Sequence, residues 1–76
     1  MAIRFTCTFQ RIGRDRPGPL TTEATDADDL AEKVYRYARP HLRSRDVEVV
    51  VDLAEKRGFI LAGFHNAGDF TVEAVA

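Results

Sequence analysis

Only one stretch of this chain carries apolar residues at helical spacing, and the sequence on both sides of it alternates with a period of two. The helical stripe recurs at steps of three and four residues: Leu30, Val34, Tyr37, Ala38 and His41. A single helix covers only one face of a sheet. The sequence therefore predicts an α+β fold, a two-layer sandwich of one α-helix on a mainly antiparallel sheet of roughly four to five strands.

Residues 3–10 carry the clearest strand pattern in the chain. Alternate positions of this segment are apolar or aromatic: Ile3, Phe5, Cys7 and Phe9. Pro17 and Gly18 match a type II turn, in which the glycine takes positive φ. Leu20–Ala24 then predicts a short second strand with Leu20 and Ala24 on the same side.

Three further strands are predicted after the helix, over residues 47–53, 58–64 and 70–75. The first and the last alternate, whereas residues 58–64 are apolar on both sides. The charged residues 54–58 predict a turn between the first two. Asn66 and Gly68 predict a second turn over residues 65–69. The predicted order is β-(β)-α-β-β-β, in one domain that spans residues 1–76.

The ends of the helix are marked by residues that favour capping and termination. Thr25 or Asp26 is expected to cap the N-terminus, and the acidic residues that follow complement the helix dipole. Pro40 predicts that the helix ends or kinks near Arg39, because proline cannot donate to the preceding turn. The acidic residues lack the spacing of a calcium-binding loop, so a helix start is the favoured interpretation.

Composition places the chain among folded proteins, with 45% hydrophobic residues, 30% charged residues and a net charge of −1. Cys7 is the only cysteine, so no intramolecular disulfide forms and a reducing compartment is favoured. We expect no signal peptide and no membrane-spanning segment. The expected location is cytoplasmic.

Candidate catalytic groups are few and scattered. Cys7 shares a strand face with aromatic residues, which predicts a core thiol rather than a nucleophile. His41 suits a helix C-terminus, and His65 suits a turn. Zinc needs three or four clustered ligands, and the glycine spacing matches no phosphate-binding loop. We therefore expect a protein that is not an enzyme, with no catalytic, cofactor-binding or metal site.

The sheet face without a helix is the strongest functional indication. It carries Val50 together with either Ile60 and Phe64 or Phe59 and Leu61, because residues 58–64 are apolar on both sides. Exposed apolar patches on small proteins mark contact surfaces. The predicted protein interface is Val50, Ile60 and Phe64, and the expected partner is a second copy or another protein, in a homodimer or as an accessory subunit. The alternative is that the long loop or the last strand covers the patch.

A second hypothesis concerns two basic segments, the first turn and the end of the helix. Their arginines are Arg11, Arg14, Arg16, Arg36, Arg39, Arg43 and Arg45. If these segments meet on one side, they form a basic patch that can bind an anionic partner, because the arginine guanidinium group suits phosphate. This alternative function is a nucleic-acid-binding accessory or regulatory protein. No membrane partner is expected.

The stretch Thr21-Thr22-Glu23-Ala24-Thr25-Asp26-Ala27-Asp28-Asp29-Leu30 runs from strand into capped helix. The order strand, turn, strand, helix and further strands resembles the β-grasp, or ubiquitin-like, arrangement. The chain ends in Glu73-Ala74-Val75-Ala76, without the paired glycines of a conjugated modifier. The resemblance therefore implies a fold and no transferable tag.

Overall fold

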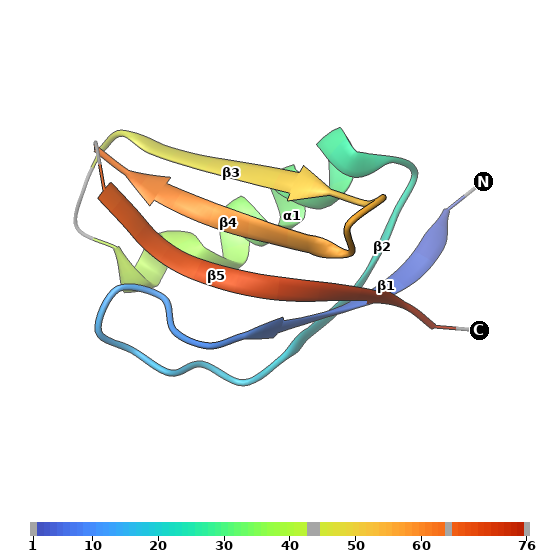
Figure 1. The fold of residues 1–76 in the computed structure, drawn as a ribbon, viewed down its shortest axis with the longest axis horizontal. Coiled ribbons are helices and arrows are strands. Elements are labelled where there is room, and N and C mark those ends of the chain that lie inside the picture. The colour runs from blue at the N-terminus through green and yellow to red at the C-terminus, as the bar shows by residue number, and fades with distance from the viewer. Residues whose placement is uncertain (1, 43–44, 64, 76) are drawn as a thin grey trace.

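The protein is described by a computed structural model that covers residues 2–42, 45–63 and 65–75. One helix packs on a five-stranded antiparallel sheet with the strand order β2-β1-β5-β4-β3, so the predicted α+β class is confirmed (Figure 1). The elements are β1 (Ile3–Phe9), β2 (Leu20–Ala24), α1 (Ala27–Ala38), the 3-10 helix η1 (Arg39–His41), β3 (Val47–Asp52), β4 (Arg57–Ala62) and β5 (His65–Ala74).

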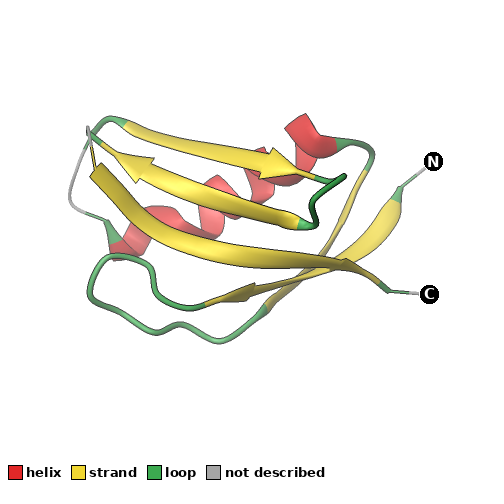
Figure 2. Cartoon of the chain, viewed as in Figure 1, coloured by secondary structure: helices red, strands yellow, loops and turns green. Residues whose placement is uncertain are grey.

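Helix α1 lies across one face of the sheet and contacts both edge strands, β2 and β3, so the sheet curls around it (Figure 2). Leu30, Val34 and Ala38 point from the helix into the space that this curl encloses. Large side chains from the central strands fill it. The buried core is Phe5, Cys7, Phe9, Ile12, Ala24, Leu30, Val34, Ala38, Ile60, Phe70 and Val72.

The helix begins and ends where the sequence predicts. Asp26 is the N-cap, and its carboxylate accepts a hydrogen bond from the Asp29 backbone N–H at 2.8 Å. The Asp29 carboxylate in turn accepts from the Thr25 backbone N–H at 2.9 Å. Pro40 is the second residue of η1, which follows directly after α1. None of the helices in the described residues is long and apolar enough to cross a membrane.

The predicted type II turn at Pro17 and Gly18 is wrong, because Gly18 has no positive φ. The chain reverses earlier, at Gly13, whose φ is 61°. Ile12 on one side of this turn is fully buried, and its N–H donates to Asp15 O at 2.9 Å. The long-range anchor at Ile12 therefore outweighs the local preference of the Pro-Gly pair.

The predicted turn over residues 65–69 is also wrong, because β5 already begins at His65. The register between β4 and β5 shifts at this point, which leaves Ala67 as an extra residue in the strand. The Asn66 side chain accepts from Gly68 N at 2.9 Å and stabilises this bulge instead of a reversal. Gly68 is required there, because a Cβ would lie 2.3 Å from Arg11 O.

Candidate functional site

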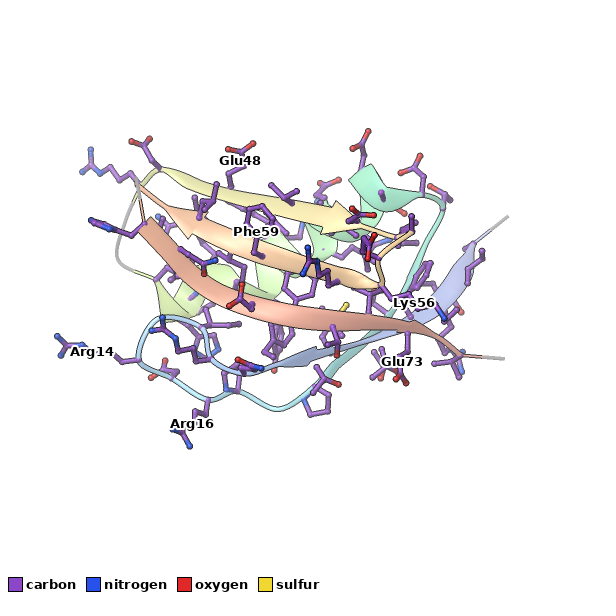
Figure 3. The ribbon with its side chains drawn as sticks, in the orientation of Figure 1. Arg14, Arg16, Glu48, Lys56, Phe59 and Glu73 are labelled. Atoms are coloured by element: carbon purple, nitrogen blue, oxygen red, sulfur yellow. The ribbon has the colours of Figure 1, made fainter. Side chains whose placement is uncertain are left out.

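The helix-free face of the sheet carries three neighbouring apolar side chains. Val50 on β3 pairs with Phe59 on β4, and Leu61 follows two residues later on the same face of β4. Phe59 remains 37% exposed, whereas Val50 and Leu61 are half-buried. We call these three residues the open-face patch. Figure 3 shows Phe59 on β4, beside the edge strand β3.

The placement of Ile60 on this face is wrong. Ile60 is completely buried on the helix side, where it pairs with Val49. Gly58 explains the orientation of β4, because a Cβ at this position would lie 2.3 Å from the Phe70 ring in the core. Residues two positions apart share a face, so Ile60 lies on the same side as Gly58, and Phe59 lies opposite. Val50 is on the expected face, and Phe64 lies outside the described residues.

Acidic side chains surround the open-face patch. Glu48 pairs with Leu61, and Asp69 pairs with Phe59. By strand alternation, the charged residues of the described open face are Arg4, Glu23, Glu48, Asp52, Arg57, Asp69 and Glu73. Arg4 is occupied by Glu23 at 3.4 Å, which leaves Arg57 as the cation of this face with no ion pair in the described residues. On the described part of this face, acidic residues therefore outnumber basic residues around the apolar patch, and the net charge is negative.

A shallow hollow of about 400 Å³ lies beside Phe59. Its lining comes from the residue after β1, the start of β4 and the middle of β5: Gln10, Arg57, Gly58, Phe59, Asp69, Phe70 and Thr71. Asp69 accepts a hydrogen bond from the Asn66 amide at 3.1 Å, so its carboxylate is held in place. The hollow extends the open-face patch with polar groups that can accept or donate hydrogen bonds at its border.

The two basic segments lie against each other at one end of the molecule. His41 Nδ1 and Asp15 Oδ2 are 2.7 Å apart, and the Tyr37 hydroxyl donates to Gly18 O at 2.7 Å. A Cβ at Gly13 would lie 3.0 Å from His41 O, so the turn packs closely on η1. Figure 3 shows Arg14 and Arg16 pointing away from this turn.

Half of the described arginines at this end are already engaged. Arg36 donates to Glu32 at 2.8 Å, and Arg39 is half-buried and donates to Leu42 O at 3.0 Å. Arg11 donates to Gly13 O at 3.3 Å. At this end of the molecule, the exposed arginines without a partner in the described residues are Arg14, Arg16 and Arg45. Arg43 lies outside the described residues.

Cys7 is a core residue, as its place in the strand pattern predicts. It is fully buried, and desolvation raises the pKa of its thiol to about 11. A thiol in this state is a poor nucleophile at neutral pH. Across the described residues, no three His, Cys, Asp or Glu side chains gather closely enough to hold a metal ion.

Comparison with known proteins finds no relative of this chain. No family model matches the sequence, and neither a curated protein nor a solved structure shows significant similarity to it. The resemblance to the β-grasp arrangement is limited to the order of elements, because β1 and β5 pair antiparallel, whereas that arrangement pairs its first and last strands in parallel.

Proposed function

We propose that this protein is a small non-enzymatic interaction module that binds a protein partner through the open-face patch. The observation that carries the proposal is Phe59, a large aromatic side chain that is 37% exposed on the helix-free face, between Val50 and Leu61 in the open-face patch. Aromatic residues at the centre of a patch are the usual anchors of protein interfaces. The buried thiol of Cys7 is compatible with the expected reducing, cytoplasmic environment.

The size of the face limits what such an interface contains. A stable interface buries about 800 Å² on each partner, or roughly one-seventh of the 5373 Å² surface of this chain. Three apolar side chains do not supply that area, so the contact must extend over the surrounding acidic residues, such as Glu48 and Asp69. Two copies meeting face to face bring these carboxylates together. The charges therefore favour a different, basic protein over a symmetric homodimer.

The test is site-specific photo-crosslinking in the cells that make this protein. A benzoyl-phenylalanine at Phe59 keeps the aromatic character of the site, and the same probe at Glu32 on the exposed side of α1 is the matched control. We expect a discrete adduct from position 59 and none from position 32. Equal labelling from both positions, or no adduct from 59, contradicts the proposal. If the adduct contains a second copy of this chain, sedimentation of the purified protein is expected to show a dimer.

A second candidate function, nucleic-acid contact, is favoured by the packing of the first turn against the helix end. Three unpaired arginines predict a weak site, since each phosphate contact contributes about −0.9 to the slope of log affinity against log salt. We expect a slope of about −3 for a short duplex, and about −1 after Arg14→Ala and Arg16→Ala together. Arg36→Ala is the control, because Arg36 is paired with Glu32. Salt-independent retention excludes this function.

A further inference from the structure

Strand β3 is an edge of the sheet, and its outer backbone groups can be assigned. Residues of an antiparallel strand point their N–H and C=O alternately to one neighbour and to the other side. Asp46 O accepts from Gly63 N at 2.7 Å, and Val50 O lies 2.6 Å from the position of a Cβ on Gly58. Even-numbered residues therefore face β4. Val47, Val49 and Val51 direct their backbone groups to the free edge.

Nothing within the described ranges pairs with this edge. No described backbone or side-chain hydrogen bond reaches Val47, Val49 or Val51 from outside the sheet. The opposite edge strand, β2, has only five residues and follows Pro19, which limits pairing there. By contrast, β3 has six residues and neither proline nor bulge. Its free edge is a template for an additional strand.

We propose that β3 accepts an extended segment of a different protein as a sixth strand, with a basic, an apolar and a basic residue at alternate positions. The side chains that face such a strand on the open face are Glu48, Val50 and Asp52. Opposite charges and apolar pairs across strands are favourable. Because the order acidic, apolar, acidic reads the same in both directions, the pattern fits a parallel or an antiparallel strand.

The same charges disfavour a second copy as the added strand. An antiparallel pair of β3 strands centred on Val50 places Glu48 opposite Asp52 twice, and like charges directly opposite are unfavourable. Centring on Val49 instead places Asp46 opposite Asp52. Either register brings carboxylates together at the join. A partner with arginine or lysine at those positions removes this repulsion and gains main-chain hydrogen bonds.

This inference goes beyond the proposed function, because it concerns the backbone edge of β3 rather than the surface around Phe59. The two proposals can be tested separately, because they concern different parts of the protein. A crosslink from the probe at position 59, with no peptide bound at β3, supports binding at the open-face patch and overturns the proposal that β3 accepts a strand. A peptide bound at β3 with no crosslink from Phe59 supports the edge and contradicts the open face as the site.

The test is an amide NMR titration of the intact protein with three synthetic peptides. The first contains Arg-Thr-Val-Thr-Arg, the second Glu-Thr-Val-Thr-Glu, and the third repeats the first with N-methyl groups on its three central residues. We expect the first peptide to shift the amides of Val47, Val49 and Val51 and to protect them from exchange. The N-methylated peptide lacks the donors needed for strand addition and is expected to bind at least tenfold more weakly.

A charge change in the protein tests the pattern independently. Glu48→Lys leaves the backbone edge intact. We expect it to weaken binding of the arginine peptide about fivefold and to strengthen binding of the glutamate peptide. Equal binding of the arginine and glutamate peptides, equal binding of the N-methylated peptide, or shifts outside β3 and its neighbour β4 each overturn the proposal. Concentration-dependent shifts of the β3 amides without peptide identify a second copy as the occupant and also overturn it.

Discussion

The register of β4 decides which residues form the candidate site, and threonine substitutions at two adjacent positions test it. Ile60→Thr and Phe59→Thr both introduce a β-branched residue that suits a strand, so strand propensity is matched. Ile60 is completely buried, whereas Phe59 is 37% exposed on the opposite face. The two variants therefore differ mainly in the burial of the side chain that is replaced.

The expected losses in free energy of unfolding follow from that burial. For Ile60→Thr, removing one methyl group from the core costs about 0.5–1.5 kcal/mol. Burying an unpaired hydroxyl costs about 1–3 kcal/mol more, which brings the total to about 1.5–4.5 kcal/mol. For Phe59→Thr, the side chain is incompletely buried at the start and no polar group enters the core, so we expect a loss of about 1 kcal/mol.

Urea unfolding monitored by circular dichroism measures both values. For a small domain, the free energy of unfolding falls by about 1 kcal/mol per molar urea. Ile60→Thr is therefore expected to lower the urea midpoint by about 1.5–4.5 M and Phe59→Thr by about 1 M. A domain of this size has a total stability of about 4–11 kcal/mol, so Ile60→Thr leaves a marginal fold. Equal losses, or a larger loss at Phe59, refute the assigned register and with it the open-face patch.

Three further predictions concern the bulge, the helix start and the core thiol. Gly68→Ala is expected to cost about 1–3 kcal/mol, because its Cβ meets Arg11 O; Gly18→Ala, with open space around it, is the control, and equal urea midpoints contradict the packing described. Hydrogen bonding from the Thr25 backbone and from Lys33 lowers the pKa of Asp29. The stability that the ionised Asp29 carboxylate contributes to the fold is therefore present above the unfolded-state pKa and is lost as pH falls through the lower folded-state pKa. Asp29→Asn should reduce the difference in Tm between about pH 6 and about pH 3, and an unchanged difference refutes this role. Cys7 should react with a thiol reagent at least about 100-fold faster in urea than in the native state, and similar rates show that the thiol is accessible.

The parts of this fold that the sequence predicts correctly depend on nearby residues. Asp26 caps the helix through Asp29, three positions away, and Pro40 acts on the turn directly before it. Residues 3–9 form a strand whose polar and apolar positions alternate, so both its structure and its buried face are readable from the pattern. In each case the cause lies within about four residues of its effect.

The incorrect predictions involve residues that contact distant parts of the chain. Pro17 and Gly18 favour a turn locally, but burial of Ile12 sets the reversal at Gly13. Asn66 and Gly68 are typical turn residues, yet they form a bulge in a strand that pairs on both sides. A propensity of a few tenths to one kcal/mol is outweighed by such burial and pairing.

The sequence by itself determined that one helix would leave a face of the sheet uncovered, because only one segment has helical periodicity. It did not determine which side of β4 occupies that face, since apolar residues stand on both sides of the strand. Only the tertiary structure decided this, by packing Phe70 into the space beside Gly58 and turning Ile60 toward the helix. The same packing brought the two basic segments together, because their contact joins residues more than twenty positions apart. A period-two pattern identifies the buried face only where the two faces differ in polarity.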